Sequence, residues 1–129
     1  MAYGSFENLE VWKRACRLAV FVYEILYECK DFGLKDQMTR AAVSIPSNIA
    51  EGAERDSKAE YIRFLHIAKG SAAELRTQVY IARKIAVLTD KAQKELTEEL
   101  MAISSMLHAL IKSLKDDSPP RTKIVQRKT

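Results

Sequence analysis

Glycine, proline and cysteine are all scarce in this chain. Among 129 residues there are 4 Gly and 3 Pro, too few for the many tight turns of a fold built from short strands. The sequence also has no uninterrupted apolar run near the roughly 18 residues that a membrane-spanning helix needs. The composition therefore disfavours a β-rich or membrane-spanning protein and indicates one small helical domain with a modest core.

The two cysteines, Cys16 and Cys29, fall in a segment whose apolar pattern predicts a single helix. Thirteen positions of helix separate them by about 20 Å, whereas the Cα atoms of a disulfide lie within about 7 Å. We therefore expect no disulfide between them. Because the sequence also shows no signal-peptide pattern, we expect a soluble protein of the reducing cytoplasm.

The short motifs of common enzymes and metal sites are missing as well. There is no HExxH, CxxC, Walker or GxSxG motif, and His66 and His108 lie on different predicted helices without a second ligand at metal-binding spacing. A di-iron carboxylate bundle would require Glu-x-x-His on two helices, and no such pattern occurs. We expect two surface or packing histidines, no cofactor and no catalytic activity.

The carboxylates do not indicate a catalytic site either. Glu98 and Glu99 are consecutive, so on a helix they point about 100° apart and cannot share a proton; a solvated face is the simplest reading. Glu51 is more interesting, because it ends a polar stripe that passes Asn48. An acid–base role for Glu51 is one interpretation, and binding of Ser or Arg side chains across a subunit contact is the one that we favour.

Apolar periodicity predicts four helices, over about residues 8–29, 34–51, 58–87 and 90–116. Ser57 and Glu60 fit a capping box at the start of the third helix, Asp90 with Gln93 can begin the fourth, and Gly52 can end the second. The connections are only a few residues long. This favours an all-α, antiparallel up-down-up-down four-helix bundle over residues 1–116, followed by a disordered basic tail over residues 117–129.

The predicted core follows the helical stripes. On the third helix the apolar stripe is Tyr61, Phe64, Ala68, Ala72, Leu75, Val79, Ala82 and Ala86. On the fourth helix, Leu96, Leu100, Ile103, Leu107, Leu110 and Leu114 repeat at spacings of four and three, which is typical of a bundle seam. Across the chain the strongest core candidates are Trp12, Leu26, Ile45, Ile49, Phe64, Leu75, Leu100 and Leu107.

Residues 40–52, RAAVSIPSNIAEG, contain a proline in the middle of the second predicted helix. Pro46 removes the hydrogen bond to the Ala42 carbonyl and costs about 3 kcal/mol relative to Ala in a helix interior, so we expect a kink. Packing must hold such a segment in place. This small-residue surface, together with a first helix that is apolar on more than one side, predicts a homo-oligomer.

Three motifs in order carry a family resemblance: FENLEVWKRA at residues 6–15, RAAVSIPSNIAEG at 40–52 and FLHIAKGSAAELRTQ at 64–78. They resemble the four-helix-bundle proteins encoded in intervening sequences of bacterial large-subunit ribosomal RNA genes, over roughly residues 5–88. The resemblance implies the bundle fold and rings of five subunits around a central channel. That family is similar in fold to accessory proteins of diversity-generating retroelements, which bind a reverse transcriptase and its template RNA.

Positive charge is concentrated in two places. Residues 117–129 carry four basic residues against Asp117, a net charge of +3, and residues 55–87 carry seven against three acids, a net charge of +4. On the third helix Lys58, Lys69, Arg76 and Arg83 fall within about 40° of one another on a helical wheel. The predicted nucleic-acid-binding residues are Arg55, Lys58, Lys69, Arg76, Arg83, Lys84, Arg121, Lys123, Arg127 and Lys128.

Two interpretations of the basic stripe stay open. It can attract phosphate without reading sequence, an effect that a ring of subunits would multiply, or it can pair with acids of the second and fourth helices. The tyrosines are scattered among predicted core positions, so no platform for base stacking is evident. The sequence thus predicts a non-enzymatic oligomeric bundle that binds RNA or DNA by shape and charge, or alternatively a protein-interaction scaffold such as an accessory subunit of a reverse transcriptase.

Overall fold

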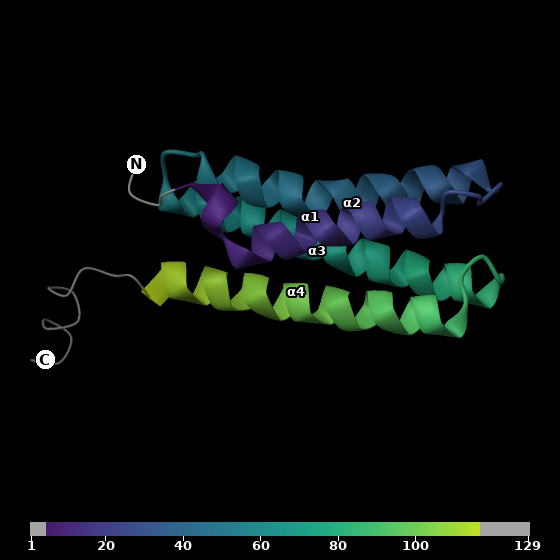
Figure 1. The fold of residues 1–129 in the computed structure, drawn as a ribbon. Coiled ribbons are helices and arrows are strands. Elements are labelled where there is room, and N and C mark those ends of the chain that lie inside the picture. Colours follow the sequence, from purple (N-terminus) through teal and green to yellow (C-terminus); the bar gives the residue numbers. More distant parts are fainter. Residues whose placement is uncertain (1–4, 117–129) are drawn as a thin grey trace, which may run out of the picture.

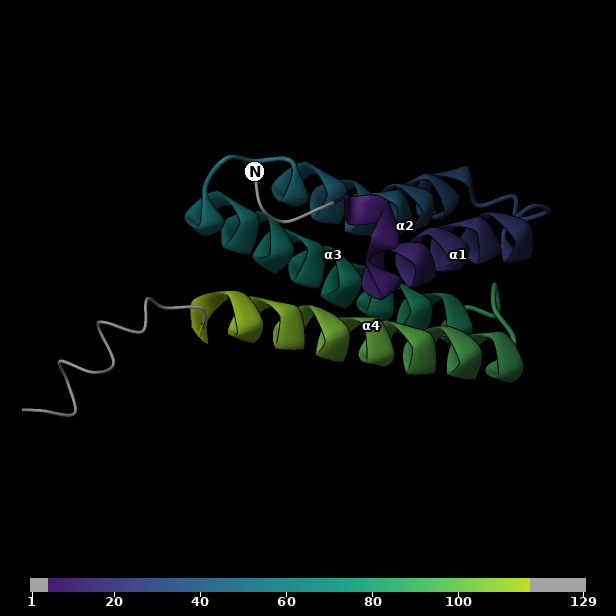
Figure 2. The same ribbon diagram turned by 60° about the vertical axis from the view of Figure 1, so that its left-hand side comes forward.

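The computed structural model describes residues 5–116, which form an all-α bundle (Figure 1). The elements are a 3-10 turn η1 (Phe6–Asn8) and the helices α1 (Glu10–Ile25), α2 (Phe32–Ala53), α3 (Lys58–Lys84) and α4 (Asp90–Asp116). Each helix runs antiparallel to the one before it, so the α1–α2 and α3–α4 loops lie at one end and the α2–α3 loop at the other (Figures 1 and 2). This confirms the predicted up-down-up-down four-helix bundle. The predicted tail over residues 117–129 lies outside the described residues.

The core lies along the axis of the bundle, and each helix packs on its neighbours in chain order, with α4 closing against α1. Seven of the eight strongest core candidates are buried, whereas Trp12 is half-buried and packs edge-on against Phe6 with ring centroids 5.2 Å apart. The α1–α4 seam is the loosest of the four. None of the helices within residues 5–116 combines the length and apolar character that crossing a bilayer requires.

The first helix is shorter than predicted at both ends. Ser5 caps the 3-10 turn through a hydrogen bond from the Glu7 backbone N–H, so α1 begins only at Glu10 and Asn8 does not cap it. The helix ends at Ile25, which leaves Cys29 outside it. The single-helix argument against a disulfide was therefore wrong in its premise, although both thiols are free.

The second helix is longer than predicted, because the Asp31 side chain accepts a hydrogen bond from Leu34 N at 3.1 Å and caps it before Phe32. Pro46 is buried inside the helix. Around it the polar side chains bond the helix's own backbone: Ser44 Oγ donates to Ala41 O at 2.8 Å, and Asn48 Nδ2 donates to Ser44 O at 2.7 Å. These bonds engage the Ala41 and Ser44 carbonyls and not the Ala42 carbonyl, so the burial of Pro46 and its neighbours is what offsets the hydrogen bond that Pro46 removes.

The sequence suggested that Gly52 ends α2, but the helix continues to Ala53. Gly52 lies in the last turn of α2, where this helix contacts α3. A Cβ atom placed there would lie 2.7 Å from Phe64 Cβ and 3.2 Å from the Tyr61 carbonyl oxygen. Real Cβ atoms essentially never lie within 3.0 Å of another atom, so the first of these two contacts could not form without a shift of the helices. The glycine is therefore required by the close contact between the two helices.

Helix α3 begins as predicted and ends three residues early. Ser57 Oγ accepts a hydrogen bond from Glu60 N at 3.1 Å, which is half of the expected capping box; the Glu60 carboxylate bonds Arg63 instead. At the other end the backbone N–H of Val87 bonds the Ala82 carbonyl at 2.8 Å, and Ala86 has a positive φ of 65°. This is a Schellman motif, which stops the helix. The predicted core residue Ala86 is consequently exposed.

Helix α4 begins at Asp90, but its cap is the residue before it. Thr89 Oγ1 accepts a hydrogen bond from Ala92 N at 3.1 Å, whereas the Gln93 side chain bonds Thr97. The predicted leucine and isoleucine seam is buried, except that Leu110 is half-buried. These buried residues pack α4 into the common core, and their position decides which side of α4 lies next to the basic stripe of α3.

Candidate nucleic-acid interface

The basic stripe of α3 lies at the border of its buried face. Lys58, Lys69, Arg76 and Arg83 are each half-buried, while Lys84 is exposed at the end of the helix. The Arg83 guanidinium bonds the Asp90 carboxylate at the start of α4, which shows that this border faces α4. The stripe therefore follows the α3–α4 seam.

Arg76 differs from every other arginine that the structure describes. Ion pairs to carboxylates engage the other six, which are Arg14, Arg17, Arg40, Arg55, Arg63 and Arg83. Arg76 has no such partner among residues 5–116, and neither do Lys69 and Lys84 on the same helix. We use the name "α3 basic surface" for Lys69, Arg76, Arg83 and Lys84.

Pairing with neighbouring acids explains part of the basic stripe. The hydrogen bond from Arg83 holds the pKa of Asp90 below its ordinary value, and the ionised Asp90 neutralises Arg83. Arg55 lies outside α3, where it pairs with Glu51 at 3.2 Å and stacks over the Phe64 ring at 4.8 Å. Glu51 thus bonds an arginine of its own chain, and the expected binding of Ser or Arg side chains across a subunit contact stays a prediction.

Among the tyrosines of residues 5–116 only Tyr61 is a core residue. Tyr23, Tyr27 and Tyr80 are 51%, 78% and 49% exposed, so the prediction that the tyrosines occupy core positions was wrong for these three. Tyr80 follows Arg76 by four residues and precedes Lys84 by four. That spacing is visible in the sequence, but the apolar pattern alone does not separate Tyr80 from its buried neighbour Val79.

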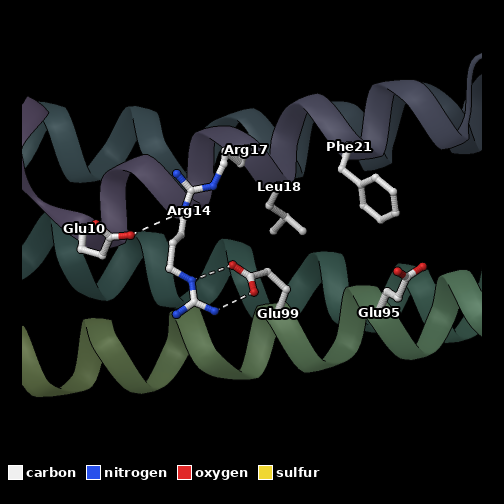
Figure 3. Close-up of a pocket in the computed structure, with 7 residues that line it drawn as sticks. All are labelled: Glu10, Arg14, Arg17, Leu18, Phe21, Glu95 and Glu99. Atoms are coloured by element: carbon white, nitrogen blue, oxygen red, sulfur yellow. Dashed lines mark hydrogen bonds and ion pairs between the residues drawn. The ribbon is translucent and has the colours of Figure 1, made fainter.

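A second candidate site is a groove of about 460 Å³ between α1 and α4, which Figure 3 shows in close-up. It is lined by Glu10, Arg14, Arg17, Leu18, Phe21, Glu95 and Glu99. Arg14 donates from Nε to Glu99 Oε2 at 2.8 Å and from Nη2 to Oε1 at 2.7 Å (Figure 3). Glu98 is exposed, as expected of a solvated face, whereas Glu99 is only one-third exposed and bonds Arg14.

The charges of this groove are largely balanced. Arg17 pairs with Glu10 at 3.5 Å, and the hydrogen bond from Arg14 to Glu99 raises the pKa of the Arg14 guanidinium. Glu99 is thus held as an ion-pair partner and is a poor candidate for a general base. Within residues 5–116 no group of His, Cys, Asp and Glu side chains is arranged to hold a metal ion, and both histidines are exposed.

An uncovered apolar surface runs along α1 and α2. Two hollows of about 420 and 480 Å³ share Val20; together they extend from Phe6 of η1, past Trp12 and Val20 of α1, to Tyr27 just after that helix. Val20 is 57% exposed, and Val43 of α2 is 41% exposed on the same surface. We refer to Trp12, Val20, Tyr23, Tyr27 and Val43 as the "α1–α2 apolar surface". It matches the expectation that α1 is apolar on a second side.

Comparisons with known proteins agree with this architecture. The chain is similar to a crystal structure described as a protein of unknown function from the S23 ribosomal protein family of Bacteroides thetaiotaomicron VPI-5482, with 25% identity, a TM-score of 0.75 and coverage of 79% of this chain and 98% of that one. No curated protein matches. The model of the family described as 23S rRNA-intervening sequence protein matches residues 7–109. The chain therefore belongs to the 23S rRNA-intervening sequence protein family.

Proposed function

We propose that this protein is a non-enzymatic, oligomeric helical bundle that binds nucleic acid through the α3 basic surface. The observation that carries the proposal is Arg76, the one arginine of the described residues without a carboxylate partner, half-buried between the unpaired Lys69 and Lys84 on the same helix. Arginine forms strong, charge-assisted hydrogen bonds with phosphate. A half-buried arginine without a carboxylate partner among the described residues suits a contact with the phosphates of a nucleic acid.

The α3 basic surface favours charge recognition over base-edge recognition. Its side chains project from one helix at the α3–α4 seam and are not arranged as an RRM, KH or zinc-knuckle site. Binding that depends on phosphate releases counterions, so the affinity should fall steeply as salt rises. The tail residues Arg121, Lys123, Arg127 and Lys128 would add to this attraction.

The test is a fluorescence-anisotropy titration of the full chain with structured RNA, single-stranded RNA and duplex DNA at two salt concentrations. The variant carries Lys69→Gln, Arg76→Gln and Lys84→Gln together. If each side chain contacts one phosphate, the slope of log K against log salt should become shallower by about 2 to 3. Circular dichroism checks that the variant keeps its helices.

A matched control removes three exposed lysines elsewhere, through Lys13→Gln, Lys30→Gln and Lys91→Gln. This control loses the same net charge but should keep most of the slope. Equal slopes for the two triple variants would mean that only total charge matters. That result would reject the α3 basic surface as the contact.

We propose further that copies of the chain associate through the α1–α2 apolar surface. Its exposed rings and branched side chains, together with the hollow lined by Phe6, Trp12 and Pro46, leave apolar area in water that a second copy would remove. The resemblance described above makes a pentamer the expected state. In such a ring the α3 basic surface would occur once in every subunit, which would strengthen the positive electrostatic potential that attracts phosphate.

Size-exclusion chromatography with light scattering tests this association. The wild-type chain should run as an oligomer at micromolar concentration, and Val20→Asp should shift it toward monomer, because a charge would be buried in the contact. Ile81→Asp, at an exposed position on α3, is the control that should leave the oligomer intact. A monomeric wild type would contradict the proposal.

The same surface favours a second candidate function, that of a protein-interaction scaffold. If the chain is monomeric and binds no nucleic acid at low salt, the α1–α2 apolar surface would be the place to seek a protein partner such as a reverse transcriptase. Binding of a candidate partner that Val20→Asp abolishes would support this function. Binding that survives the substitution would place the contact elsewhere.

A further inference from the structure

Tyr80 occupies a distinctive position within the α3 basic surface. Its side chain is 49% exposed, one turn after Arg76 and one turn before Lys84. Positions four apart on a helix are neighbours on its surface, about 40° apart in direction. The ring is therefore flanked at both ends by cations that have no carboxylate partner within residues 5–116.

We infer that Tyr80 stacks on a base of single-stranded nucleic acid while Arg76 and Lys84 hold the phosphates on either side. This inference rests on the proposed function and narrows its ligand class. An aromatic ring within a positively charged track is the arrangement by which proteins bind single strands, because every base offers a face for stacking. In a duplex the base faces are covered by their neighbours, so a ring on a helix surface cannot reach them.

The dimensions of the surface agree with such a ligand. Eight residues of helix separate Arg76 from Lys84, about 12 Å, which is at most a few nucleotides at about 3.4 Å each and fewer where the Tyr80 ring takes the place of a stacked base. Ala73, which points nearly the same way as Tyr80 two turns earlier, is exposed and small, so it does not crowd the strand's path. Leu75 and Val79 anchor the same turns in the core and keep the backbone under Tyr80 fixed.

Helix α4 contributes a further cation at this level. Lys94 follows Asp90 by one turn on nearly the same side of α4. Asp90 pairs with Arg83, and α3 and α4 run antiparallel (Figure 1), so a step along α4 from Asp90 corresponds to a step back along α3 from Arg83 toward Tyr80. Lys94 is exposed and has no carboxylate partner among the described residues. The strand would thus lie along the α3–α4 seam.

The experiment compares four full-length proteins: wild type, Tyr80→Ala, Tyr80→Phe and Ile81→Ala. The control position Ile81 is also 49% exposed but points about 100° away on the helix. The probes are a single-stranded RNA of mixed sequence and an abasic oligonucleotide of the same length, which keeps the phosphates and lacks the bases. Anisotropy at fixed salt gives the dissociation constants.

We expect Tyr80→Ala to bind the mixed-sequence strand about 5- to 150-fold more weakly than wild type, the range for loss of one base–aromatic stack. Its affinity for the abasic strand should be unchanged. Tyr80→Phe, which keeps the ring, and Ile81→Ala should both bind like wild type. This pattern would support the inference.

If Tyr80→Ala bound both strands with the affinity of wild type, the inference that Tyr80 stacks on a base would be overturned. If the Lys69, Arg76 and Lys84 triple variant were still weakened in the same assay, charge recognition would stand and only stacking would fail. If that variant also bound like wild type, or if the wild-type chain bound no strand at all, the proposed function would fail together with the inference.

Discussion

Arg14 of α1 and Glu99 of α4 are 85 positions apart in the chain and form a two-pronged ion pair, with nitrogen–oxygen distances of 2.8 and 2.7 Å. The pair bridges α1 and α4, the loosest seam of the bundle. Both side chains remain about one-third exposed, at 32% and 33%. Solvent therefore screens the pair, and its contribution to stability is modest despite the favourable geometry.

Disruption of this pair should be measurable but mild. We expect a double-mutant cycle with Arg14→Gln and Glu99→Gln to give a coupling free energy of about 1 kcal/mol, measured by urea unfolding at low salt. Arg17 and Glu10, a more exposed and longer pair at 3.5 Å, provide the matched cycle, for which we expect a smaller coupling. Equal coupling in the two cycles would show that the two-pronged geometry has no energetic consequence.

Gly52 of α2 and Gly70 of α3 should respond in opposite directions to substitution by alanine. Gly52→Ala forces a Cβ to within 2.7 Å of Phe64 Cβ and 3.2 Å of backbone, so we expect a loss of about 1 to 3 kcal/mol. Gly70→Ala meets no atom within 4 Å on α3 and should stabilise by up to about 1 kcal/mol. Thermal unfolding of both variants checks the signs. A stable Gly52→Ala protein would contradict the close α2–α3 contact.

Ala86→Gly should stabilise the end of α3. Ala86 adopts a φ of 65°, which glycine tolerates better than any residue with a side chain, and the hydrogen bonds of the Schellman motif remain. We expect a gain of about 0.5 to 1 kcal/mol in the free energy of unfolding. Ala73→Gly, at an exposed position inside the same helix, should instead destabilise by a similar amount.

Asp90→Asn should strengthen nucleic-acid binding. Asp90 neutralises Arg83, whose hydrogen bond lowers the pKa of this carboxyl further below neutral pH. Removal of that charge frees Arg83 for phosphate, so we expect a slope of log K against log salt steeper by about 0.7 to 0.9. Asp36→Asn, which frees Arg40 on α2 away from the α3–α4 seam, is the control and should leave the slope unchanged. An unchanged slope for Asp90→Asn would place Arg83 outside the contact.

Much of the fold could be predicted because its signals are local. The spacing of Leu100 and Leu107 indicates a seam, and the Ser57 cap marks the start of α3 within a few residues of sequence. The end of α3 could not be predicted, since the αL position at Ala86 carries no glycine to mark it. The cap at Asp31 was missed because it precedes an exposed apolar residue, Phe32.

The candidate site, like the fold, could be predicted from the sequence only in part. Lys69 and Arg76 could be placed on one side of a helix from their spacing, and the structure puts them at a half-buried border. Whether a cation is neutralised depends on carboxylates from other helices. Asp90 of α4 pairs with Arg83 of α3, and Glu99 of α4 pairs with Arg14 of α1. The exposure of Tyr80 likewise depends on which side of α3 faces α4. Helical periodicity alone does not determine these relationships.

The most direct test of the α3 basic surface is the salt dependence of single-stranded RNA binding by wild type and by the Lys69→Gln, Arg76→Gln, Lys84→Gln variant. We predict salt-sensitive binding by wild type and a slope shallower by about 2 to 3 for the variant, with the lysine control close to wild type. Binding by wild type with the same slope in all three proteins would contradict the assignment of this surface as the nucleic-acid contact.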